Sequence, residues 1–408
     1  MRTWKTVAVA FTAVLSLGAA SAIDGGMRRE EDDGNRPSLT IYTGNLALVR
    51  RSVEVTLAPG ARGVTIDGLP TNMDPSSLIV LNPDLTLTGA HGFRSYQDPV
   101  SGAGASMSLD LEVLRQVERL EIVFMTHGLN WTADYSVLIA RDDASARVDG
   151  FAAITNGSGT RYDGAEIQLL AGTIQRGGRA RLEADDFRAV AMESVAGSPE
   201  LQGATFGDYH IYTVSQPLTL WAGESRRIRL MGASEVKARK EYALVHHVAY
   251  HHQNPDSETR PVAVGYRLQR PKGTELGDLP LPSGQVKLLQ RDEDGRVQLL
   301  GISTIPNTPK DVDLELSTGF AFDILGTRTQ TNYSRLPDGA YESAWKVELR
   351  NESESDVTVQ VVERLSGDWR IVESTHSPEK ISAGAVRFQI RVPAEGSATL
   401  EYTVQVRS

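Results

Sequence analysis

Apolar and polar residues alternate along much of this chain, and the clearest example covers residues 128–140. Successive side chains of a β-strand point to opposite faces of the sheet. One face of this segment then carries Trp131, Ala133, Tyr135, Val137 and Ile139. The other face is mostly polar. Such a strand is half buried, with its large side chains packed against an opposing sheet.

The same two-residue period recurs from one end of the chain to the other. Predicted strands cover residues 38–43, 46–57, 120–126, 147–156, 165–170, 209–214, 225–231, 242–250, 262–269, 345–349, 357–361, 386–392 and 400–406. Short strands separated by turn signals are typical of sandwiches rather than of parallel α/β sheets.

Turn residues predict several hairpins. Residues 38–57 contain Gly44-Asn45 between two extended runs, and residues 285–301 contain Asp294-Gly295, which favours a tight β-turn. Segments 109–114 and 120–126 flank RQVER and predict another hairpin, with a helix over 109–120 as the alternative.

Two segments depart from this alternation. Residues 96–106 are rich in Gly, Ser and Pro and predict a loop. Residues 184–203 predict a helical or disordered excursion.

These patterns predict an all-β protein with two or more antiparallel β-sandwich modules in tandem, of the immunoglobulin or fibronectin kind. The predicted modules are 38–105, 106–240 and 241–408. Asn156-x-Ser158 and Asn351-x-Ser353 each follow a predicted strand and precede a polar turn. This echo indicates either related modules or the ordinary sequence of such hairpins, and we favour the second interpretation.

The N-terminus has the features of a secretory signal peptide. Arg2 and Lys5 precede an apolar run, and Ala20-Ser21-Ala22 fits a cleavage site. We expect a signal peptide over 1–22, a flexible charged spacer over 23–37, and a periplasmic or extracellular mature chain. No later segment has enough consecutive apolar residues for a transmembrane helix.

Composition narrows the classes of function. The sequence contains no cysteine, which excludes disulfides, zinc-thiolate sites and thiol catalysis. Its formal net charge is −10, and loss of Arg2 and Lys5 makes the mature chain more negative. An acidic protein is poorly suited to bind nucleic acid.

Four histidines form the most conspicuous candidate metal site. They are His246, His247, His251 and His252. On a strand, His247 and His251 lie about 13–14 Å apart, too far for one metal ion. On a helix they lie one turn apart, but the Glu of a zinc-protease motif is missing. We therefore predict a partly exposed strand beside a loop and assign no metal ligand.

Other candidate sites also have simpler explanations. Asp292 and Asp294 imitate part of a calcium loop, but the remaining ligand positions are absent, so a hairpin turn is favoured. The tryptophans suit either a sugar-stacking platform or core packing, and core packing is favoured for Trp131 and Trp345. We assign no catalytic, cofactor-binding or metal-binding residue and expect no cofactor.

Several stretches of the chain resemble one protein family. They include GLNWTADYSVLI, TNGSGTRYDGAEIQLLAG, GDYHIYTVSQPLTL, GFAFDILGTRTQT and WKVELRNESESDVTVQVVERLSGDWRI. In order and number they resemble the secreted family called domain of unknown function 4139, some members of which are labelled mucoidy inhibitor A. The resemblance implies an all-β exported protein without an established activity, cofactor or catalytic residue. The region around 93–107 looks shorter than in that family, and the coiled-coil insert of some members is absent.

The sequence therefore predicts an exported, non-enzymatic envelope or cell-surface protein with a binding or scaffolding role. Its expected partner is an envelope protein or a glycan. The alternative is a glycan-acting hydrolase or carbohydrate-binding protein of the envelope, since sequence does not show whether two carboxylates meet in a cleft.

Overall fold

The computed structural model describes residues 36–98, 102–172, 201–206, 209–247, 253, 256–337 and 339–407. The predicted signal peptide, all but the last two residues of the predicted spacer, and residues 184–200 of the predicted excursion lie outside this part. Residues 201–203 of that excursion belong to a strand.

The described residues form an all-β protein, as the alternation predicts. One sheet has the order β11 (Leu201–Phe206), β12 (Tyr209–Val214), β10 (Tyr162–Ala171), β1 (Ser38–Tyr42), β2 (Leu46–Leu57), β7 (Val117–Thr126) and β4 (Ile79–Val80), with β13 (Leu218–Leu220) on β10. A second sheet has the order β3 (Gly63–Leu69), β6 (Gly102–Val113) and β5 (Leu85–Asp98). Among the described residues the single helical element is the turn η1 (Pro75–Ser77), so none of their helices is long enough to cross a membrane.

The third sheet is the largest. Its order is β17 (Val297–Ile305), β16 (Gly284–Arg291), β8 (Leu129–Ile139), β9 (Ser145–Asn156), β14 (Ser225–His247), β15 (Glu258–Leu268), β18 (Leu314–Arg335), β19 (Tyr341–Asn351), β24 (Gly396–Arg407) and β21 (Asp368–Ser374). Off this path, β20 (Val357–Arg364) pairs with β14 and β23 (Ala385–Val392), and β22 (Glu379–Ser382) pairs with β23.

The predicted β8 strand is confirmed. Its apolar face is buried, and Trp131 and Tyr135 are almost completely covered. Their polar atoms still find partners: Trp131 Nε1 donates to the Leu170 carbonyl at 3.1 Å, and the Tyr135 hydroxyl donates to the Pro282 carbonyl at 2.8 Å. The strand therefore anchors a core without leaving a buried donor unpaired.

Buried apolar side chains of the described chain gather in two clusters. The first core extends from Leu39 to Leu316 and includes the face of β8. The second extends from Leu244 to Val406 and is built mainly from β18 to β24. Two cores fit tandem sandwich modules, and the residues of the two cores interleave along the chain between Leu244 and Leu316.

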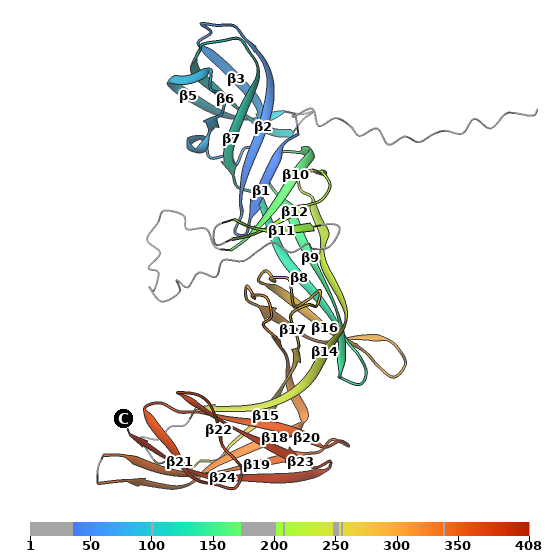
Figure 1. The fold of residues 1–408 in the computed structure, drawn as a ribbon, viewed down its shortest axis with the longest axis vertical. Helices are drawn as coiled ribbons and strands as arrows, with labels where there is room; N and C mark the ends of the chain where they lie inside the picture. The colour runs from blue at the N-terminus through green and yellow to red at the C-terminus, as the bar shows by residue number, and fades with distance from the viewer. Residues whose placement is uncertain are drawn as a thin grey trace, which may run out of the picture. The chain divides into compact units, whose positions relative to one another are not determined.

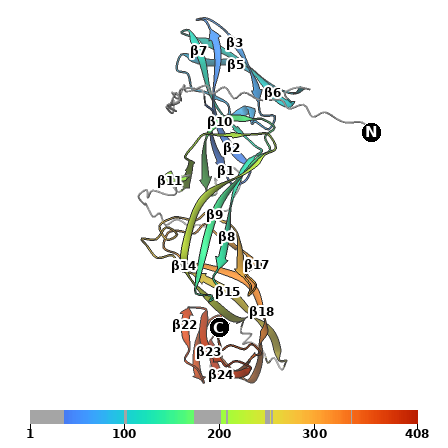
Figure 2. The ribbon, with the colours of Figure 1, turned by 90° about the vertical axis from the view of Figure 1, so that its right-hand side faces the viewer.

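One continuous strand serves both cores. The first half of β14 pairs with β9, whereas its second half pairs with β15 and, in parallel, with β20 (Figures 1 and 2). Its register with β9 shifts twice, the second time between Ala233 and Val236, where Glu235 has a φ of 59°. The predicted module limits at 105/106 and 240/241 fall inside β6 and β14.

Each of the two modules contains the same kind of hydrogen-bonded corner, at the end of β9 in the first module and at the end of β19 in the second. The Asn156 amide donates to the carbonyls of Thr160, Leu220 and Trp221, and the Asn351 amide donates to those of Ser355, Val392 and Pro393.

The second polar residue of each motif completes the corner. Ser158 and Ser353 each donate from Oγ to their asparagine Oδ1 at 2.7 Å. The neighbouring strands match as well, because β1 is parallel to β10 as β14 is parallel to β20. These shared bonds favour related modules over the ordinary-hairpin interpretation.

Some predicted local structure is confirmed and some is wrong. The hairpins β1–β2 and β16–β17 are confirmed. The loop over 96–106 is wrong, because residues 96–98 and 102–106 belong to the paired strands β5 and β6. The hairpin across RQVER and its helical alternative are also wrong, since β6 and β7 belong to different sheets.

Candidate functional site

A groove with a cavity of about 280 Å³ lies where strands of the two cores adjoin. We call it the β18 groove. It is lined by Lys240, Tyr242, Val264, Tyr266, Gln290, Leu300, Thr318, Phe320, Ala321, Phe322, Asp323, Ile324 and Ser353. Tyr266 belongs to the first core, whereas Ile324 belongs to the second.

Two phenylalanines of this groove are exposed to solvent. The exposed fraction is 71% for Phe320 and 96% for Phe322. A fully exposed phenylalanine is unusual, because burying such a side chain stabilises a protein by about 1.5–3 kcal/mol. Ala321 and Ile324 pack with the second core instead.

A break in the β15–β18 ladder produces this exposure. Phe320 pairs with Ala263, but the next pair joins Leu325 to Pro261, so several residues of β18 face one residue of β15. Pro261 has no N–H with which to continue the ladder. Gly319 precedes the break with a φ of 127°, a conformation that favours glycine. The bulged segment therefore turns the two aromatic side chains outward.

Asp143 organises a polar cluster beside the groove. Its carboxylate accepts hydrogen bonds from the Tyr266 hydroxyl at 2.7 Å and from Gln290 Nε2 at 2.9 Å, and it pairs with Lys240 at 3.3 Å. Burial, reinforced by the bond to Asp143, raises the pKa of Tyr266, so the phenol stays protonated and donating. The cluster joins the β8–β9 turn to β14, β15 and β16.

Leu300 of the edge strand β17 lines the groove, and β17 also exposes Val297, Leu299 and Ile302 to solvent. β17 ends the pairing order of its sheet. It approaches β18 closely, since the Ser317 amide donates to Ser303 Oγ at 3.3 Å. An aromatic groove beside an apolar edge strand is suited to bind apolar side chains of a partner.

The structure describes two of the four histidines considered as a candidate metal site. His246 is buried, with Nδ1 at 3.4 Å from Glu363 Oε1, so the expected partial exposure is wrong for this residue. His247 is exposed. His251 and His252 lie outside the described residues. Within the described ranges no group of three or more His, Asp or Glu side chains is arranged to hold a metal ion.

The Asp292 motif forms the favoured hairpin turn. Asp292 Oδ1 accepts the Arg296 amide at 2.8 Å, and its Oδ2 accepts Gln298 Nε2 at 2.9 Å. Gly295 has a φ of 83°, as such a turn requires.

The tryptophans divide between core and surface. Trp131 and Trp345 are buried, which confirms core packing, and Trp369 is nearly so. Trp221 is 52% exposed, with the Arg161 guanidinium 3.6 Å from its ring centroid.

The residue pattern alone does not identify Phe320 or Phe322 as functional. The available signal is the pair of phenylalanines at alternate positions beside Gly319, but the same pattern also fits a buried strand face. Their exposure depends on the break opposite Pro261, which only the strand pairing reveals. No family model matches the chain, and no match to it occurs among the curated proteins.

Proposed function

We propose that this protein is an exported, non-enzymatic binding or scaffolding protein of the cell envelope or cell surface, and that a protein partner docks in the β18 groove. The exposure of Phe320 and Phe322 carries the proposal. The signal-peptide features and the family resemblance support the location.

The energetics favour a partner that covers the groove. Removing two exposed phenylalanines from water contributes several kcal/mol, at about 25 cal/mol per Å² of apolar surface. Aromatic side chains that fill pockets commonly dominate the binding energy of protein interfaces. The one cation that lines the groove among the described residues, Lys240, is already paired with Asp143. The groove therefore favours apolar contact over an ionic ligand.

Crosslinking tests the proposal directly. A photoreactive benzoyl-phenylalanine at position 322 is expected to crosslink a reproducible protein in envelope fractions of the source cell. The same group at Val372, an exposed residue of β21 that does not line the groove, is the matched control. An identical set of adducts at both positions, or none at position 322, contradicts the proposal.

Substitution of the two phenylalanines measures their contribution to the affinity for the partner. The double variant Phe320→Ser/Phe322→Ser is expected to weaken partner binding at least about tenfold, since each lost aromatic contact contributes more than 1 kcal/mol at a binding hot spot. Val372→Ser should leave the affinity unchanged. The thermal unfolding temperature of both variants should stay near that of the parent, because the replaced side chains are exposed.

Carbohydrate binding is a second candidate function, favoured by the exposed Trp221 indole. Indoles on a protein surface stack on sugar rings, although Arg161 already covers part of this one. If the indole binds glycan, Trp221→Ala should abolish retention of the protein on envelope polysaccharide, whereas Phe322→Ser should not. Equal retention of both variants contradicts this role.

A further inference from the structure

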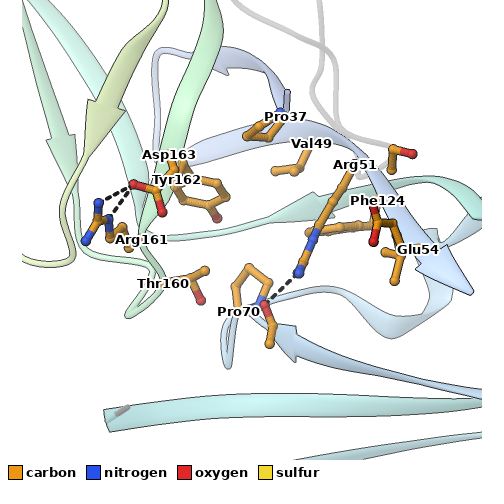
Figure 3. Close-up of a pocket in the computed structure, with 13 residues that line it drawn as sticks. Pro37, Val49, Arg51, Glu54, Pro70, Phe124, Thr160, Arg161, Tyr162 and Asp163 are labelled. Atoms are coloured by element: carbon orange, nitrogen blue, oxygen red, sulfur yellow. Dashed lines mark hydrogen bonds and ion pairs between the residues drawn. The ribbon is translucent and has the colours of Figure 1, made fainter. Parts of the chain in front are cut away.

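A second cavity, of about 440 Å³, lies beside β2 in the first module (Figure 3). We call it the Arg51 pocket. Residues of β2, Gly68 and Pro70, Phe124 of β7, and the turn before β10 form its walls. Its size is within the usual range for small-molecule sites.

Arg51 occupies a position where a core residue is expected. It shares a strand face with Val49 and Val53, both of which pack in the first core. Its Nη1 donates to the Gly68 carbonyl at 2.9 Å and to that of Asp67 at 3.5 Å. Within the described residues no carboxylate pairs with it. Burial lowers the pKa of this guanidinium, but an arginine remains charged in a protein.

The preceding residue shows the ordinary arrangement. Arg50 points to solvent and forms an ion pair with Glu121 at 2.6 Å. The two adjacent arginines of β2 therefore differ. Arg50 is paired with a carboxylate, whereas Arg51 lines the pocket without a carboxylate partner among the described residues. Arg51 is half-buried, and a cation partly withdrawn from water without a counter-ion gains from a ligand that supplies the negative charge.

Tyr162 provides a second unsatisfied group in the same pocket. It is 5% exposed, and its hydroxyl makes no hydrogen bond. Burial raises the pKa of Tyr162 to about 12, with a smaller opposing effect of the nearby Ser158 hydroxyl, so the phenol is a neutral donor at physiological pH. Figure 3 shows the Arg51 side chain and the Tyr162 hydroxyl directed into the same space.

None of the other charged residues that line the pocket forms an ion pair with Arg51. Arg161 and Asp163 form an ion pair with each other. Glu54 also lines the pocket, but it is exposed to solvent and forms no ion pair with Arg51.

We propose that the Arg51 pocket binds the carboxylate of a small organic acid. The planar guanidinium matches the two coplanar oxygens of a carboxylate, and the Tyr162 hydroxyl donates to one of them. The adjoining apolar wall of Val49, Pro70 and Phe124 receives the uncharged part of the ligand. This site is separate from the β18 groove, and neither proposal depends on the other.

The test uses the full chain and matched pairs of ligands. Butyrate, octanoate, benzoate and phenylacetate are titrated by calorimetry, each beside its primary amide, with inorganic phosphate as a further ligand. Carboxylates are expected to bind at least about tenfold more tightly than their amides, because a hydrogen bond to a charged group is stronger than one to a neutral group. Tighter binding of phosphate, or equal binding of acids and amides, overturns the proposal.

Three variants locate the binding. Arg51→Gln should reduce carboxylate affinity at least about tenfold, whereas Arg50→Gln should leave it unchanged. Tyr162→Phe should reduce affinity about fivefold while keeping or raising the unfolding temperature, since it removes a buried hydroxyl that has no partner. Carboxylate affinity that survives both Arg51→Gln and Tyr162→Phe overturns the assignment, as does failure of every acid to bind the parent protein.

Discussion

Replacing Glu363 with glutamine is expected to lower the free energy of unfolding by about 3–5 kcal/mol, because it leaves a buried arginine without its counter-ion. Glu363 is completely buried in the second module. Its Oε1 accepts a hydrogen bond from Arg328 Nε at 3.1 Å, and its Oε2 lies 3.1 Å from an Arg328 terminal nitrogen. The glutamine keeps the shape of the side chain but not its charge.

The surroundings of Arg328 explain the size of the expected effect. Burial alone lowers the pKa of Arg328, but Glu363 and the Tyr402 hydroxyl outweigh it and hold the pKa above its usual value. Tyr402 accepts from Arg328 at 3.2 Å, and the guanidinium lies 3.4 Å from the Trp345 ring centroid. All of these groups are buried, so water cannot replace the lost carboxylate.

Urea unfolding followed by tryptophan fluorescence measures the effect, since Trp345 and Trp369 belong to the second core. Glu373→Gln, an exposed position on β21, is the control and should change stability by less than about 0.5 kcal/mol. Adding Arg328→Met to Glu363→Gln should recover part of the loss, because an apolar pair tolerates burial better than a lone charge. A loss no larger than that of the control would refute the account.

Replacing Asn156 or Asn351 with alanine is expected to lower the free energy of unfolding by about 3 kcal/mol. Each amide group donates to three main-chain carbonyls, and leaving a buried acceptor unpaired costs about 1–3 kcal/mol. Asn351→Asp should have an effect of similar size, since a carboxylate cannot donate these bonds.

The two alanine variants should act on different modules. Asn156→Ala is expected to weaken the first core and Asn351→Ala the second, which amide hydrogen exchange can distinguish. Asn332→Ala is the matched control, because Asn332 is exposed on β18. Equal stability of all three variants would show that the shared corner is not a structural requirement.

The sequence predicts fold class well because local alternation decides it. Trp131 and Tyr135 lie on the predicted face of β8, since a one-residue slip would expose the whole set. Glycine content gives a wrong loop prediction where a glycine is instead required for close packing within a strand. Gly104 is part of a predicted loop, but it lies in β6 opposite Tyr96, and a side chain there would come within 2.9 Å of the Tyr96 ring.

The candidate sites are less predictable because they depend on distant partners. Arg51 reads as one of two ordinary basic residues in β2, and only the fold separates it from the paired Arg50. Glu363 reads as one more surface acid, yet its register places it beside His246 on a parallel strand. Contacts of this kind join residues far apart in the sequence, so no local sequence pattern predicts them.

The continuity of β14 limits how this chain can be divided. A peptide cut anywhere within Ser225–His247 removes hydrogen-bonding partners from β9, or from β15 and β20. Gene fission at this point would thus produce two incomplete fragments rather than two autonomous proteins. Recombination that exchanged one module would have to bring its half of β14 with it, which disfavours exchange of a single module.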